Sequence, residues 1–167
     1  KLMKEKEVVI KYGEYQNKED LGVEDSKLVL SANEATNNSY APYSDFKVGA
    51  AILLDNGEII KGTNQENSAY PSGLCAERVA IFFANSQFPD AVIKSIAIAS
   101  QTDRFESDEP ISPCGSCRQV ISEAENRQKS KIRVIMSGNK CVTRIVEGIE
   151  NLLPFGFQED KLKKTCR

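Results

Sequence analysis

The sequence predicts an α/β protein, a three-layer α/β/α sandwich built on a mixed five-stranded sheet. The chain has 167 residues, of which 40% are apolar and 28% are charged, a composition typical of a globular domain with one hydrophobic core. Short apolar runs of strand length alternate with longer segments of helical spacing. One tight turn joins two of these runs into a hairpin, as expected of a sheet that mixes antiparallel and parallel pairs.

The chain is expected to divide into an N-terminal extension, residues 1–24, and a single domain, residues 25–167. Within the extension, residues 7–12 form a candidate strand. The domain begins with a helix of about three to four turns, capped at Asp25 or Ser26, because apolar residues recur there at helical spacing. These apolar residues are Leu28, Val29, Ala32 and Ala35.

A hairpin follows this helix. Residues 46–54 and 58–63 are its strands, and Asp55-Asn56-Gly57 is its turn. The rest of the domain contains three more helices and three more strands. The helices cover 74–84, 114 to about 127 and 146–153, and the strands cover 93–99, 132–136 and 141–145. Helices placed between buried strands in this order predict the sandwich.

Composition excludes several classes of function. The chain has no histidine, which removes Ser-His-Asp and Cys-His catalysis and every imidazole metal ligand. Its net charge of −2 shows no basic excess, so no nucleic-acid partner is expected. No apolar run approaches the roughly 20 residues of a membrane-spanning helix, so no membrane partner is expected. The charged start of the chain lacks a signal-peptide core, which predicts a cytoplasmic protein.

The cysteines point to a metal. Five is an odd number in a chain too large to need a disulfide scaffold, so metal or redox chemistry is the better interpretation. Cys114 and Cys117 are three residues apart and share one face of a predicted helix. With Cys75 at the start of another helix they supply three thiolates. A fourth position left open for water is the pattern of catalytic zinc.

Two alternatives remain at this point. A fourth cysteine, Cys141 or Cys166, could close a structural zinc site, or Cys114 and Cys117 could be a redox pair. Glu77 favours the catalytic site, because a carboxylate beside an open metal position can take a proton from water and return it to a substrate.

These clusters are part of a wider pattern. The segments CAER at 75–78 and PCGSCRQ at 113–119, with YSDFKVGAA at 43–51 and NQEN at 64–67, resemble the zinc-dependent cytidine deaminases, which include an all-cysteine variant. The resemblance runs from about Leu28 to about Leu162 and fits the small, homotetrameric, three-cysteine branch of that family. It implies a cytidine deaminase-like fold and one Zn²⁺ per subunit.

The resemblance also implies a reaction. Cytidine, and 2′-deoxycytidine as well, would be hydrolysed to uridine or deoxyuridine plus ammonia, in pyrimidine salvage. Cys75, Cys114 and Cys117 would bind the zinc. Water activated by the metal would attack C4 of the pyrimidine, while Glu77 protonates N3 and then carries a proton to the departing ammonia.

Further residues match positions that bind the substrate in that family. Asn64 and Glu66 resemble the pair that hydrogen-bonds the ribose 3′-hydroxyl, and Phe46 resembles the aromatic residue that flanks the base. The backbone of Ala76 is expected to donate to O2 of the pyrimidine. Phe157 matches an aromatic residue that packs on the ligand from a neighbouring subunit.

Arg78 is a candidate site residue on the ground of charge as well as of resemblance. Zinc with three thiolates carries excess negative charge, which weakens it as a Lewis acid. A guanidinium that donates to a ligand sulfur would offset this charge.

Other functions remain as alternatives. The site could deaminate another aminopyrimidine compound, such as blasticidin S, although the run 64–67 favours a nucleoside. A polynucleotide substrate is disfavoured, because the charge-balanced domain offers no phosphate-binding surface. The last alternative is a non-catalytic, zinc-stabilised module.

Overall fold

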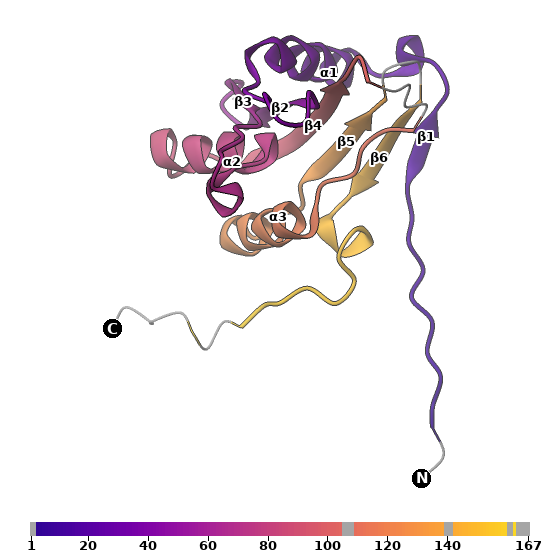
Figure 1. Ribbon diagram of the computed structural model, residues 1–167. Helices are drawn as coiled ribbons and strands as arrows, with labels where there is room; N and C mark the ends of the chain where they lie inside the picture. The colour runs from indigo at the N-terminus through magenta and orange to yellow at the C-terminus, as the bar shows by residue number, and fades with distance from the viewer. Residues whose placement is uncertain (1–2, 105–108, 139–141, 160–161, 163–167) are drawn as a thin grey trace.

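A mixed sheet of six strands forms the middle layer of the computed structural model, which describes residues 3–104, 109–138, 142–159 and 162 (Figure 1). The strands are β1 (Gly13–Tyr15), β2 (Lys47–Leu54), β3 (Ile59–Thr63), β4 (Ile93–Gln101), β5 (Arg133–Ser137) and β6 (Thr143–Glu147), in the spatial order β1-β6-β5-β4-β2-β3. The helices are α1 (Val23–Ala35), α2 (Ala76–Gln87) and α3 (Gly115–Gln128). The α/β class and the layered architecture are confirmed.

The sheet is mixed for the expected reason. The hairpin β2–β3 is antiparallel, with Ile52 opposite Ile60, whereas β4 and β5 are parallel, with Ile96 opposite Val134. A parallel pair needs a long crossover connection. The stretch that contains α3 supplies it and thereby places α3 on one face of the sheet.

The core is divided by the sheet into two parts, because successive side chains of a strand point to opposite faces. In β2, Ala50 and Ile52 pack with α2 and α3, and Ala51 and Leu53 pack with α1. Nearly every residue of β2 is therefore buried. Figure 1 shows α1 on one face of the sheet and α2 with α3 on the other.

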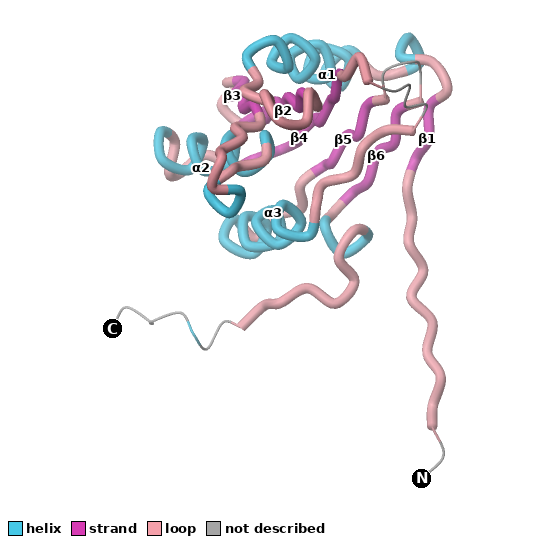
Figure 2. Tube along the Cα trace, in the orientation of Figure 1, coloured by secondary structure: helices cyan, strands magenta, loops and turns pink. Residues whose placement is uncertain are grey.

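The sheet has one strand more than the predicted five. The additional strand is β1, which pairs antiparallel with β6 through Glu14 and Arg144. Its sequence, Gly-Glu-Tyr, carries no alternating apolar pattern, so it gave no signal. The candidate strand at 7–12 does not form, and this part of the extension runs away from the sheet as a loop (Figure 2). Leu21, also in the predicted extension, is buried in the core.

The prediction of a helix over 146–153 is wrong. Its first residues continue β6, since Val146 pairs with Val134. Gly148 then takes a φ of 86°, a left-handed value that suits glycine and ends the strand. Only a short 3₁₀ turn follows, η4 (Ile149–Asn151). The other 3₁₀ turns are η1 (Lys18–Asp20), η2 (Thr36–Asn38) and η3 (Tyr70–Ser72).

Cys141 and Cys166, the possible fourth metal ligands, lie outside the described residues. Within the described residues, no helix combines the length and the apolar character needed to cross a membrane.

Candidate metal centre and substrate cavity

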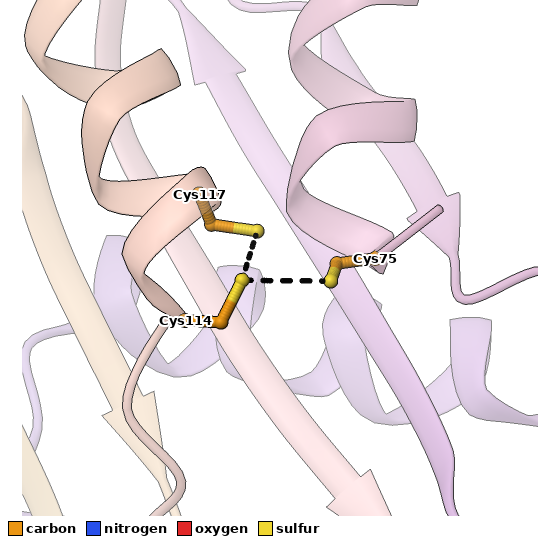
Figure 3. A group of neighbouring side chains, drawn as sticks. All are labelled: Cys75, Cys114 and Cys117. Atoms are coloured by element: carbon orange, nitrogen blue, oxygen red, sulfur yellow. Dashed lines mark hydrogen bonds between the residues drawn. The ribbon is translucent and has the colours of Figure 1, made fainter. Parts of the chain in front are cut away.

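The starts of two helices bring the three cysteines together. Cys75 is the N-cap residue of α2 and Cys114 is the N-cap residue of α3. Neither thiol makes a side-chain capping hydrogen bond. Cys117 lies one turn into α3 and is fully buried. Figure 3 shows the three sulfur atoms turned toward one another between the two helix ends.

The sulfur positions fit a zinc ion. The Cys114 sulfur lies 3.7 Å from that of Cys75 and 3.5 Å from that of Cys117. Zn–S bonds of about 2.3 Å in a tetrahedron place neighbouring sulfurs about 3.8 Å apart. All three atoms lie within 4.8 Å of one another, and no fourth cysteine, aspartate or glutamate of the described residues joins them. This part of the chain thus offers three ligands and leaves a fourth position for water or substrate.

The surroundings favour the thiolate form at Cys75. A hydrogen bond from the Cys117 thiol, together with the guanidinium of Arg78, lowers the pKa of Cys75 to about 5. The same hydrogen bond to Cys75, together with burial, raises the pKa of Cys117. Arg78 Nη2 lies 3.8 Å from the Cys75 sulfur. The positive ends of α2 and α3 add further stabilisation of negative charge.

Glu77 lies in the first turn of α2, directly after the cysteine end of the helix. Its side chain is only 4% exposed. Burial, reinforced by the negative charge of Cys75, raises the pKa of this carboxyl. A carboxyl group whose pKa moves toward neutrality can both accept and release a proton at working pH.

An open cavity of about 870 Å³ lies beside the cysteines. This volume suits a small organic ligand. It brings together residues that are distant in sequence. Among the residues that line it are Phe46, Asn64, Glu66, Cys75, Glu77, Arg78 and Cys114. The loop before β2, the loop before α2 and the starts of α2 and α3 therefore all line this cavity.

The two polar residues assigned to the sugar are held firmly. Asn64 accepts a hydrogen bond from Val48 N at 2.8 Å and donates one to Phe46 O at 2.8 Å. These bonds fix its amide against the start of β2 and leave one amide hydrogen for a ligand. Glu66 accepts hydrogen bonds from Tyr43 N and Ser44 N.

The remaining assigned residues differ in their position. Phe46 is half-buried, lines the cavity and packs against the core. Ala76 is the first residue of α2, where a backbone N–H has no intrahelical acceptor. Phe157 does not line the cavity of its own chain, and its side chain is 68% exposed. Its backbone is held to Gln119 on α3.

Sequence reasoning missed part of the cavity wall. Tyr43 and Tyr70 line it and form an edge-to-face pair with ring centroids 6.1 Å apart. Ile111 and Ser112 line it as well. Tyr43 lies inside the segment 43–51 that carries the resemblance, so a signal existed. The residues next to Tyr70 and Ile111 in the sequence form no motif that predicts a cavity.

A metal-binding trio of thiols, a buried carboxyl and an adjoining cavity define a zinc-dependent hydrolytic enzyme. The family model described as "Cytidine and deoxycytidylate deaminase zinc-binding region" matches residues 23–132. The chain belongs to this family.

Individual relatives agree. A cytidine deaminase of Sporosarcina psychrophila is 39% identical over 138 residues, which are 81% of this chain and 93% of the relative. A probable cytidine deaminase of Dictyostelium discoideum is 40% identical over 151 residues, 89% of this chain and 92% of the relative. The crystal structure of a cytidine deaminase from Burkholderia pseudomallei is 35% identical and superposes with a TM-score of 0.69, over 78% of this chain and 97% of the other.

Proposed function

We propose that this chain hydrolyses cytidine and 2′-deoxycytidine to uridine and 2′-deoxyuridine, with release of ammonia, as a step of pyrimidine salvage. The observation that carries the proposal is the position of Glu77. Glu77 shares a cavity with Asn64, Glu66 and two members of the three-thiol group, Cys75 and Cys114. Family membership, through relatives named cytidine deaminase, supports the same substrate.

Cys75, Cys114 and Cys117 would hold one Zn²⁺ per subunit. When bound, zinc supplies the Lewis acidity that makes a water molecule nucleophilic near neutral pH. Arg78 is the residue that moderates the charge of the thiolates, because its guanidinium approaches the Cys75 sulfur. This contact withdraws negative charge from the ligand and so keeps the metal acidic.

Glu77 moves the protons. It takes one from the attacking water and delivers it to N3 of the pyrimidine, which makes C4 a better electrophile. The water oxygen bonds to C4 in the same step. Glu77 then moves the proton of this new C4 hydroxyl to the amino nitrogen, so that the C4–N bond breaks, C4 becomes a carbonyl and ammonia leaves. A raised pKa suits both transfers, because it reduces the free-energy difference between the ionised and the protonated carboxyl near neutral pH.

The cavity wall orients the nucleoside. Phe46 would pack on the base, and the first backbone N–H of α2, that of Ala76, would donate to O2. Asn64 and Glu66 would bind the ribose 3′-hydroxyl, since an amide hydrogen and a carboxylate together satisfy a group that accepts and donates. None of these contacts reads the 2′-hydroxyl, so both sugars are accepted.

The quaternary structure proposed is a homotetramer in the cytoplasm. Large apolar side chains are exposed on the single chain, including Phe82, Phe83 and Phe157, and patches of this kind mark subunit interfaces. Phe157 would then reach a neighbouring subunit's cavity. The three cysteines would bind zinc only as reduced thiolates, so a compartment that keeps thiols reduced, such as the cytoplasm, suits this site.

An ultraviolet assay of cytidine conversion tests the proposal. The purified protein, with its zinc content measured, should convert cytidine and 2′-deoxycytidine, and Glu77→Ala should abolish both reactions. Blasticidin S is the comparison substrate. A folded, zinc-loaded protein that converts only blasticidin S, or no substrate at all, would contradict the proposal, and the assignment of Asn64 and Glu66 would be the first to be withdrawn.

A further inference from the structure

The loop before β2 contains a serine whose hydroxyl joins two parts of the cavity wall. Ser44 donates from Oγ to Oε1 of Glu66 at 2.5 Å and accepts from Phe46 N at 3.0 Å. We propose that Ser44 is a positioning residue that aims the Glu66 carboxylate at the substrate's 3′-hydroxyl. The proposal rests on the sugar-binding role proposed above for Glu66.

The first step is the number of donors on the carboxylate. Oε2 of Glu66 accepts from Tyr43 N at 2.9 Å and from Ser44 N at 3.3 Å, and Oε1 accepts from the Ser44 hydroxyl. A carboxylate offers about four acceptor positions. The three protein donors therefore leave one position, on Oε1, which is enough for a single hydroxyl of the ligand.

The second step is the direction of the Ser44 hydroxyl. Because Phe46 N donates to Oγ, the hydroxyl proton is free to point at Glu66 and is not used elsewhere in the loop. Without this bond, only the two backbone donors on the other oxygen would hold the carboxylate. The carboxylate could then rotate about its last bond, and the free acceptor position would lose its direction.

The third step is the shape of the loop itself. Asp45, between Ser44 and Phe46, has a φ of 54°, a left-handed value that is costly for a residue with a side chain. The hydrogen bonds around Ser44 and the bond from Asp45 N to Ala41 O at 3.0 Å hold this conformation. One hydroxyl thus couples the sugar carboxylate to the backbone that carries the aromatic residue beside the base.

Charge agrees with this arrangement. The hydrogen bond from Ser44 is the largest of the effects that lower the pKa of Glu66, followed among the lowering effects by those from the backbone of Tyr43 and Ser44. The remaining one is the charge of Arg104. Glu66 is therefore held as an anion, an acceptor ready for a hydroxyl donor.

The experiment compares Ser44→Ala and Ser44→Thr on cytidine and on 3′-deoxycytidine, which lacks the hydroxyl in question. A hydrogen bond to a charged group is typically worth about 12- to 140-fold in an equilibrium constant, and only part of this is lost here because Glu66 keeps its two backbone donors. In Ser44→Ala we expect KM for cytidine to rise about five- to tenfold with kcat within about twofold. KM for 3′-deoxycytidine should stay nearly unchanged. Ser44→Thr, which keeps a hydroxyl, should restore most of the affinity for cytidine.

Two further variants separate the possible failures. Ser39→Ala is the matched control, because Ser39 Oγ donates to Val48 O nearby and does not contact Glu66. Glu66→Gln tests the proposed sugar role itself. If Glu66→Gln discriminates between the two substrates and Ser44→Ala does not, the Ser44 proposal is overturned and the sugar role stands. If Glu66→Gln affects both substrates equally, the sugar role is wrong, and the Ser44 proposal is overturned with it.

Discussion

The proposed proton transfer depends on one side chain, Glu77, and Glu77→Gln tests this role. The amide has nearly the same shape, so the packing of α2 and the three thiols should not change. It cannot exchange protons with water or substrate, and loss of a general acid–base typically costs about 10²–10⁴-fold in rate. We expect kcat, measured by ultraviolet absorbance, to fall by at least about 10²-fold.

The control for this variant is Glu58→Gln, a substitution of an exposed glutamate in the β2–β3 turn. It should leave kcat, zinc content and the melting temperature unchanged. Activity within tenfold of wild type in a zinc-loaded Glu77→Gln protein would show that Glu77 is not the proton shuttle.

Cys114 permits a separate test of the metal site, because it is exposed in the single chain and packs little. Cys114→Ala should therefore act through the metal alone. We expect zinc content to fall well below one per subunit and the melting temperature to drop, since binding free energy adds to folding free energy. With excess chelator present, wild type and variant should melt at nearly the same temperature. A full complement of zinc in the variant would remove Cys114 from the ligand set.

At this scale the sequence predicted most of the residues that the structure brings together at the candidate site. Cys75, Glu77 and Cys114 could be found because spacing and chemistry mark them together. Ser44 was not singled out, since a serine in a loop has no chemical signature until the fold brings Glu66 to it. Tyr70 was missed for the same reason.

The position of α2 against the sheet places two residues of the candidate site, Cys75 and Glu77. Gly62 on β3 lies under the first turns of this helix. A Cβ built there would meet Ala76 O at 2.4 Å and Ala80 N at 2.6 Å, both backbone atoms that cannot turn away. The glycine therefore sets how closely the start of α2, with Cys75 and Glu77, approaches the sheet.

Gly62→Ala is predicted to damage the metal site by displacing this helix start. Overpacking of this kind costs about 1–3 kcal/mol of stability. The matched control is Gly49→Ala, where the added Cβ would meet Ala32 O of α1 at 2.1 Å on the opposite face. Both variants should be less stable in urea.

Zinc affinity distinguishes the two variants. Measured by chelator competition in the folded proteins, it should fall about tenfold or more in Gly62→Ala and stay near the wild-type value in Gly49→Ala. Equal zinc affinity in both variants would show that the spacing between α2 and β3 does not position the site.

Elements with strong periodicity were predicted well, and the errors have clear causes. The strands β2 and β4 are apolar runs buried on both faces, so the sequence marks them. The strand β1 is visible only through its partner β6, and such pairing depends on residues about 130 positions away. The helix predicted over 146–153 rests on apolar residues at helical spacing. In the structure, these residues belong to the end of β6 and to the core.

At the scale of the whole molecule, two aromatic residues near the C-terminal end, Phe155 and Phe157, lie at the surface of the single chain. Phe155 and Phe157 are 89% and 68% exposed, and two hydrogen bonds with the Gln119 side chain hold the backbone of Phe157. Exposed aromatic rings on an ordered backbone are typical of residues that dock into another subunit. In the proposed homotetramer, the subunit that receives them depends on the symmetry of the assembly, which no sequence pattern reveals.

Subunit mixing tests whether Phe157 completes a neighbour's cavity. In a homotetramer, Phe157→Ala and Glu77→Ala subunits would each form poor sites alone. In a mixed assembly, a cavity with Glu77 from one subunit can receive Phe157 from the other, so intact sites reappear. We expect co-expressed mixed assemblies to exceed the summed activity of the two separate variants several-fold, with Phe155→Ala in place of Phe157→Ala as the control for general aromatic packing. Activity that never exceeds the sum would place Phe157 outside the active site, and a monomer by light scattering would exclude the shared site altogether.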